Sequence, residues 1–209
     1  MKKTYTVLFV AMLVFNFTAC KSESKKENTN EVTTVTKKSN ATFSLKKATN
    51  EVNFTAYKTT DKVAVGGQFK EVNILSGGEG NSIKEAINNT EFSIPVSSIF
   101  TKDSSRDYKI QKFFFGVMDK TKLLSGKLLI ENDSIGSATI IMNGVSEKVP
   151  FTYTIKDKTF SMEATMDVNK WNAAAALASL NKICEALHTG SDGISRTWND
   201  VALNISSTF

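Results

Sequence analysis

The two residues with the most reactive side chains, Cys184 and His188, lie four positions apart. Residues at i and i+4 of a helix share a face, so a helix here would bring the thiol and the imidazole together. Such a pair can bind a metal ion or act as a nucleophile with its base. Because His188 is the only histidine, a metal would also need carboxylates such as Asp192 or Asp200, and their spacing fixes no third ligand. We favour the ordinary interpretation, a buried thiol and a histidine in the last turn of a helix.

A second group with possible chemistry is Arg106-Asp107. A guanidinium suits phosphate, so Arg106 is a candidate for binding the headgroup of a ligand. The alternative is an ion pair or a cap at the start of a helix. The glycine-rich Ser76–Gly80 lacks the Gly-Lys-Ser/Thr of a phosphate loop, and the sequence has no Gly-x-Ser-x-Gly of a serine hydrolase. We therefore predict a protein that is not an enzyme and that has no cofactor and no metal site.

The distribution of charge argues against a nucleic-acid partner. The net charge is +5, but Lys2 and Lys3 carry +2, and residues 20–41, with five lysines and three glutamates, carry another +2. This leaves +1 for residues 42–209, which is too little for a surface that binds phosphate backbones. The length of 209 residues and the apolar fraction of 41% indicate one globular domain with a tail.

The first residues predict export. Lys2 and Lys3 precede an apolar run, Tyr5–Phe17, which is shorter than the ~20 residues of a membrane span. We therefore interpret residues 1–19 as a signal peptide. The run ends in Phe17-Thr18-Ala19-Cys20, which resembles the lipobox of bacterial lipoproteins, and this resemblance implies acylation of Cys20. The alternative is an ordinary secretory signal with a chance cysteine.

Residues 20–41 are predicted to be a disordered polar tether, because Lys, Glu, Asn, Thr and Ser dominate them. Lys21 rather than an aspartate follows Cys20, so we expect a lipid anchor in the outer membrane, with the domain in the periplasm or at the surface. Once Cys20 is acylated, Cys184 has no partner for a disulfide, and we expect its thiol to be buried.

The clearest signal of fold is the strict alternation of apolar and polar residues over Thr159–Val168. Alternation predicts a strand with one face on a core. Val149–Lys156 alternates as well and is joined to it by a turn at Asp157-Lys158, while Asn143-Gly144 predicts a hairpin just before. Residues 42–209 contain about eight such one-sided strands. They predict a mainly β domain, a single antiparallel eight-stranded barrel whose interior is filled by side chains or holds one slim ligand.

Two short helical segments interrupt the strands. Ser104–Phe115 has Ser104 or Ser105 as its candidate N-cap. Ala173–Leu187 carries an apolar stripe and should end at Gly190 in the C′ position. We also expect one helical turn within Ser82–Asn89 and a bend or bulge at Gly66-Gly67.

Five short stretches have a characteristic order along the chain. They are Val52–Lys58 (VNFTAYK), Gly66-Gly67 with Phe69, Phe92–Pro95 (FSIP), Arg106-Asp107 before Phe113-Phe114, and Asn143-Gly144-Val145 before Val149. Together they resemble the YceI-like family over about residues 42–209. The resemblance implies an exported, lipocalin-like β-barrel that binds a polyisoprenoid lipid. Trp171–Trp198 is longer than in short-looped members and resembles a variant among lipoproteins of the Bacteroidetes.

The resemblance implies a ligand in the barrel, and methionines and alanines at inward positions would give it a soft, apolar lumen. The alternative is that these side chains pack against one another. The predicted ligand-binding residues are Phe54, Ala56, Phe92, Phe113, Phe114, Met118, Met142, Phe151, Tyr153, Phe160, Met162 and Met166, with Arg106 at the headgroup. We predict a membrane-tethered lipoprotein that sequesters or transports a polyisoprenoid or other long-chain lipid. The alternative is a non-enzymatic interaction module with a filled core that acts through its outer surface, and a redox or metal site at Cys184 and His188 is a more remote one.

Overall fold

The alternating stretches of the sequence form long antiparallel strands. In the computed structural model, which describes residues 40–209, β9 (Ile135–Met142) pairs with β10 (Val145–Lys156). The hairpin turn between them has φ angles of 52° at Asn143 and 70° at Gly144, as expected for this pair of residues. β10 then pairs with β11 (Thr159–Asp167) across Asp157, whose φ is 55°. The predicted meander is confirmed.

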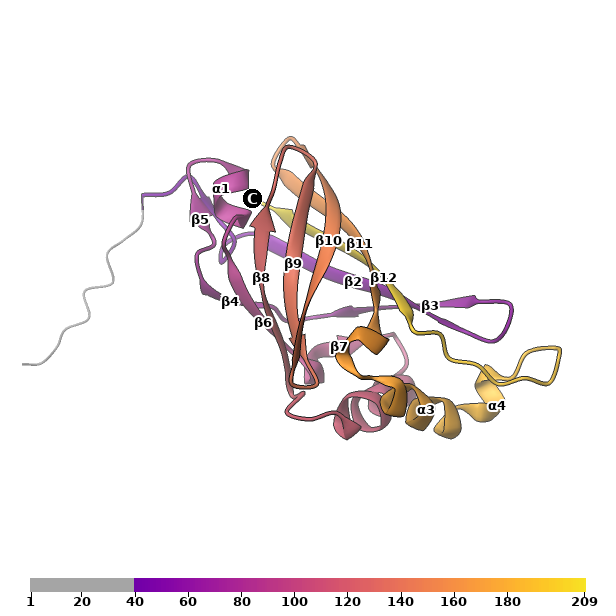
Figure 1. The fold of residues 1–209 in the computed structure, drawn as a ribbon. Helices are drawn as coiled ribbons and strands as arrows, with labels where there is room; N and C mark the ends of the chain where they lie inside the picture. Colours follow the sequence, from indigo (N-terminus) through magenta and orange to yellow (C-terminus); the bar gives the residue numbers. More distant parts are fainter. Residues whose placement is uncertain (1–39) are drawn as a thin grey trace, which may run out of the picture. The chain divides into compact units, whose positions relative to one another are not determined.

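These strands lie in the middle of a ten-stranded antiparallel sheet that curls on itself (Figure 1). Its order is β4-β6-β8-β9-β10-β11-β12-β2-β3-β7. The other seven strands are β2 (Thr49–Lys58), β3 (Val63–Phe69), β4 (Asn73–Ser76), β6 (Glu91–Pro95), β7 (Ile99–Phe100), β8 (Leu123–Ile130) and β12 (Asp200–Thr208). A separate pair is formed by β1 (Phe43–Ser44) and β5 (Glu79–Gly80). The mainly β, antiparallel class is confirmed. The strand number exceeds eight because the two edge strands, β4 and β7, are four and two residues long, too short to show alternation.

Short helices occupy the connections between strands. They are α1 (Ile83–Ile87), α2 (Ser104–Lys109), α3 (Ala174–Ile183) and α4 (Glu185–His188), the 3₁₀ helices η1 (Val96–Ser98), η3 (Phe115–Val117) and η4 (Val168–Trp171), and the π-helix η2 (Ile110–Phe114). The predicted N-cap of the segment Ser104–Phe115, Ser104 or Ser105, is wrong. Asp103 caps α2, because its carboxylate accepts the backbone N–H of Arg106 at 3.1 Å.

Two glycine predictions hold only in part, since β3 has no bulge at Gly66-Gly67 and the C′ residue Gly190 lacks a positive φ. The register between β2 and β3 continues without a break past Gly67, where a Cβ would overlap the Phe54 ring. α4 ends at His188, the C-cap Thr189 is extended (φ −75°, ψ 124°), and Gly190 follows at C′ without the left-handed conformation that this position often has. A Cβ at Gly190 would lie 2.8 Å from the Thr60 hydroxyl oxygen and 2.9 Å from an Asp192 carboxylate oxygen, so these two side chains would have to move to accept it.

Fully buried side chains lie near both ends of the barrel. At one end Trp171 is completely buried, and its indole N–H donates to the Ile140 carbonyl at 2.9 Å. At the other end Phe160, 1% exposed, packs with Phe151 and Tyr153. All of this core lies between Phe43 and Phe209, within one compact unit, so this part of the chain has a complete core of its own. No helix in residues 40–209 has the length and hydropathy of a membrane span.

Candidate functional site

A cavity of about 220 Å³ lies inside the curled sheet, between the two packed ends. Because side chains alternate along a strand, every second residue of β11 and β12 faces it. On β11 these are Phe160, Met162, Ala164 and Met166, and on β12 they run from Val201 to Ser207. At ~3.3 Å per residue, the lining part of β12 is about 20 Å long. The cavity is therefore elongated along the strands.

The lining is almost entirely apolar, and its few polar side chains are engaged within the protein. Ser207 donates to the Asn50 side-chain oxygen at 2.6 Å, and Thr90 donates to the Ala86 carbonyl at 2.8 Å. Near the other end the Trp198 indole N–H donates to the Thr59 carbonyl at 2.7 Å, and Thr197 donates to the Asn181 side chain at 2.8 Å. A ligand in this space therefore meets apolar surface and no unused polar group on these side chains.

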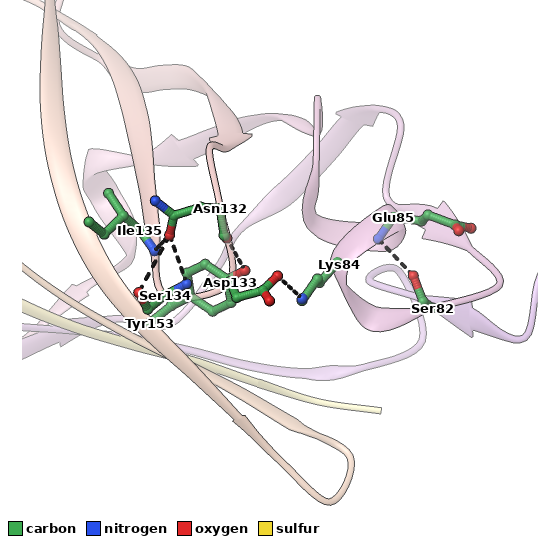
Figure 2. A network of polar contacts seen from close by, with 8 residues as sticks. All are labelled: Ser82, Lys84, Glu85, Asn132, Asp133, Ser134, Ile135 and Tyr153. Atoms are coloured by element: carbon green, nitrogen blue, oxygen red, sulfur yellow. Dashed lines mark hydrogen bonds and ion pairs between the residues drawn. The ribbon is translucent and has the colours of Figure 1, made fainter.

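The end of the cavity beside α1 is sealed. Leu45, Ile87 and Phe160 line it and are 3%, 1% and 1% exposed. An ion pair of 2.6 Å between Lys84 and Asp133 ties α1 to the turn between β8 and β9 (Figure 2).

The turn that α1 meets is itself fixed by hydrogen bonds, as Figure 2 shows. The Asn132 side-chain oxygen accepts the backbone N–H groups of Ser134 at 3.0 Å and Ile135 at 2.9 Å. The Tyr153 hydroxyl donates to the Asn132 carbonyl at 2.6 Å. Hydrogen bonds and one exposed ion pair thus connect strand, turn and helix at this end.

The opposite end is covered less completely, by η2, α3 and the segment before β12. Ile110 of η2, Leu177 and Leu180 of α3, and Trp198 all line the cavity, and each keeps part of its surface accessible. We interpret this end, where helices and a loop rather than strands cover the cavity, as its mouth. A π-helix such as η2 is rare and concentrates at functional sites, which fits its place at the mouth.

Cys184 and His188 lie just outside this mouth, and the helix that was predicted to carry both is interrupted at Cys184. Cys184 is 6% exposed, and burial raises the pKa of its thiol. Burial, and next the nearby Lys58 ammonium, lower the pKa of His188, whose Nδ1 lies 2.7 Å from the Thr197 hydroxyl oxygen. Within residues 40–209, no group of three or more His, Cys, Asp or Glu side chains is arranged to hold a metal ion.

Arg106 lies on α2, the helix that leads into η2 at the mouth. Its guanidinium is 3.6 Å from the Asp103 carboxylate and 42% of its side chain is exposed. Asp107 serves the fold, because its carboxylate accepts both the N–H and the hydroxyl of Thr101, at 2.8 and 2.6 Å. The two residues that were considered together therefore have different surroundings.

Most of the predicted ligand-binding residues meet around the cavity. Eight line it: Phe54, Ala56, Phe92, Phe114, Met142, Phe160, Met162 and Met166. Four lie elsewhere. Phe151 and Tyr153 have the expected inward parity but belong to the packed core around Phe160, beyond the sealed end. Met118 follows η3 and is buried in the core around Trp171, and Phe113 packs against Tyr108, with ring centroids 6.4 Å apart.

The sequence interpretation missed the lining from the stretch Trp171–Trp198. Leu177, Leu180, Thr197 and Trp198 all face the cavity. The apolar stripe of Ala173–Leu187 was a usable signal for the two leucines, since a stripe must cover something. No local pattern marks Trp198. Its place depends on a hydrogen bond of 3.0 Å from its backbone N–H to the carbonyl of Tyr57, which is far away in the sequence.

The fold occurs in proteins of known structure. A domain from Saccharophagus degradans described as a polyisoprenoid binding domain aligns with a TM-score of 0.54 and 12% identity, over 76% of this chain and 93% of that one. BcnA of Burkholderia cenocepacia aligns with a TM-score of 0.51 and 13% identity, over 80% of this chain and 99% of its own. No curated protein sequence matches significantly. The family model of the YceI-like domain matches residues 43–209, so the chain belongs to the YceI-like family.

Proposed function

We propose that this protein binds a long apolar lipid of the polyisoprenoid class inside its barrel. The observation that carries this proposal is the elongated cavity of about 220 Å³ whose polar lining side chains are satisfied within the protein. For comparison, an apolar cavity of ~150 Å³ stays dry and takes up benzene. A filled core, which the alternative interaction module requires, would leave no such space.

Two further observations support a chain-like ligand. The similar domain from Saccharophagus degradans is described as polyisoprenoid binding. Three of the lining side chains are methionines, Met142, Met162 and Met166, which change rotamer easily and can adapt to a longer ligand. We infer binding rather than catalysis, because the polar side chains of the lining are engaged in the fold and none is left to act on a bound molecule.

We propose that a polar headgroup, where the lipid has one, stays at the mouth near Arg106. The guanidinium is 42% exposed and lies on α2, directly before the η2 residue Ile110 that lines the cavity. Arg106→Ala should weaken retention of a phosphorylated isoprenoid without unfolding the domain, because Arg106 makes only a long ion pair with Asp103. Unfolding of this variant would instead indicate a structural role.

The anchor and location remain part of the same proposal. Three predictions fall outside the described residues, apart from Asn40 and Ala41. They are the signal peptide of residues 1–19, the acylation of Cys20 and the tether of residues 20–41. We infer an exported lipoprotein of the outer membrane. The mass of the mature protein tests this directly, and a mass that corresponds to an N-terminus at Cys20 with added acyl chains supports it. The matching control is Cys20→Ala, which should be released into the soluble envelope fraction.

The lipid itself is tested by native mass spectrometry of protein purified from cell envelopes beside a denaturing spectrum. We expect a bound mass that is lost on denaturation and is identified as an isoprenoid or another long-chain lipid. The bare chain mass, unchanged after incubation with lipid extract, would support the interaction module instead.

A further inference from the structure

The end of the barrel that carries the mouth also carries exposed apolar side chains. Ile183, Leu187 and Ile194 are 45%, 59% and 56% exposed. We call these three residues the apolar rim. Ile183 lies one turn after Leu180, which lines the cavity, and Leu187 lies one turn further. Apolar surface therefore continues from the cavity to the outside along α3 and α4.

Hydrogen bonds hold the rim together and join it to the sheet. Ile194 lies in a small hairpin in which its carbonyl accepts the N–H of Gly190 at 3.0 Å. The Lys58 ammonium at the end of β2 donates to the Leu187 carbonyl at 3.0 Å. Exposure of these side chains is thus built into an ordered corner of the fold, where large apolar groups cost hydration unless a partner covers them.

Cations surround the same corner. Lys58, Arg106 and Lys109 are the charged groups that act on both Cys184 and His188, and each lowers the pKa of these two residues. The Lys58 ammonium, 3.0 Å from the Leu187 carbonyl, places a positive charge directly beside the rim, while Glu185 of α4 and Asp192 of the hairpin are acids of the same corner.

Trp198, which lines the cavity, lies beside two further cations. The Arg196 guanidinium lies 3.7 Å and the Lys62 ammonium 4.9 Å from the centre of its ring. Tryptophan beside cationic and apolar side chains is typical of proteins at the boundary between lipid headgroups and acyl chains.

Resting on the proposed function, we infer that the apolar rim docks on the surface of a phospholipid bilayer. Ile183, Leu187 and Ile194 enter the acyl boundary, and Lys58 and Lys109 lie near the phosphates. The mouth then faces the membrane, so that an apolar ligand passes between bilayer and cavity without crossing water. Docking of this kind combines buried apolar area with attraction to anionic lipid.

The test uses residues 40–209, which contain the complete core and lack Cys20, with vesicles of phosphatidylethanolamine and phosphatidylglycerol. We expect the domain to sediment with them. Leu187→Glu should lower the partition coefficient by about tenfold to a hundredfold, the cost of losing one buried leucine. The matched control is Leu75→Glu on β4, with 58% exposure against 59% for Leu187, and it should sediment like the unchanged domain.

The cations are tested separately. Lys109→Gln should lower partitioning by about fivefold at low ionic strength. The difference should shrink in high salt, because mobile ions screen exposed charges. Equal partitioning of the variant and the unchanged domain at low salt would remove Lys109 from the proposed surface.

Failure of docking and failure of lipid binding are distinguishable. A domain that takes up geranylgeraniol from solution but does not sediment with vesicles would overturn docking alone. Equal partitioning of Leu187→Glu and Leu75→Glu would overturn the rim. If the domain is a dimer that Leu187→Glu dissociates, and if it does not bind vesicles, the rim would be assigned to contact with a second copy of the chain.

A variant of the cavity separates the two functions from the other side. Ala164→Phe, which fills the cavity, should sediment with vesicles like the unchanged domain while its uptake of geranylgeraniol is lost.

Discussion

Filling the cavity from within should abolish most of the lipid affinity while leaving the fold intact. Ala164 lines the cavity on β11, between Met162 and Met166. At about 24 cal/mol per Å³ of cavity, complete filling of the 220 Å³ is worth about 5 kcal/mol. An apolar cavity of ~150 Å³ already accommodates benzene, so a phenyl ring at position 164 occupies more than half of this space. Ala164→Phe should therefore remove about 3 kcal/mol of binding free energy, or roughly a hundredfold in Kd.

The assay is a titration with geranylgeraniol, followed through the fluorescence of Trp198, which lines the cavity. The matched control is Thr165→Phe, the next residue of β11, which is exposed on the outer face. It should bind like the unchanged protein. Thermal unfolding checks the fold of both variants, since overpacking typically costs only about 1–3 kcal/mol. A folded Ala164→Phe variant that binds geranylgeraniol with unchanged affinity would refute the cavity as the binding site.

Three further predictions concern the surrounding structure. Trp171→Phe should lower the free energy of unfolding by about 1–3 kcal/mol in urea titrations, because the Ile140 carbonyl loses the indole donor of the fully buried Trp171; an unchanged midpoint would contradict this. Burial and the cations Lys58, Lys109 and Arg106 lower the pKa of His188 from its ordinary 6.5. The unfolded chain therefore takes up a proton at His188 below pH 6.5, where the folded domain does not. The free energy of unfolding should fall as the pH drops from 6.5 towards the folded-state pKa of His188. His188→Gln should flatten this pH dependence. The Cys184 thiol, buried and with a raised pKa, should react with iodoacetamide far more slowly in the folded domain than in urea, and equal rates would show that it is accessible.

Local patterns were sufficient to predict the elements whose residues alternate strictly or form a defined turn. β10 and β11 are long and buried on one face, so periodicity predicted both strands, although β10 begins at Val145, four residues before the alternation that starts at Val149. Asn143-Gly144 shows why a turn can be predicted, since both residues must adopt positive φ. The short strands β4 and β7 offer no such period, and long-range pairing determines them.

The sequence was sufficient to predict which strand positions face inward, but not where the cavity ends along the strands. Parity placed Phe151 and Tyr153 inside the barrel correctly, yet aromatic packing with Phe160 closes the interior there. Parity alone cannot tell a filled layer from an open one, because that difference depends on the summed side-chain volume of all strands. The mouth depends on contacts between distant segments, such as Trp198 with Thr59, which no sequence spacing reveals.

The central claim, that the lipid lies inside the barrel, is tested most directly by NMR of isotope-labelled methionine methyl groups. Residues 40–209 contain four methionines, of which Met142, Met162 and Met166 line the cavity. Met118 is also buried, in the core around Trp171, and lies outside the lining, so it is an internal control. With geranylgeraniol bound, we predict intermolecular NOEs from the isoprenoid methyls to the three lining methionines and none to Met118. NOEs confined to residues of the outer face, with the three lining methyls unperturbed, would contradict a lumen site.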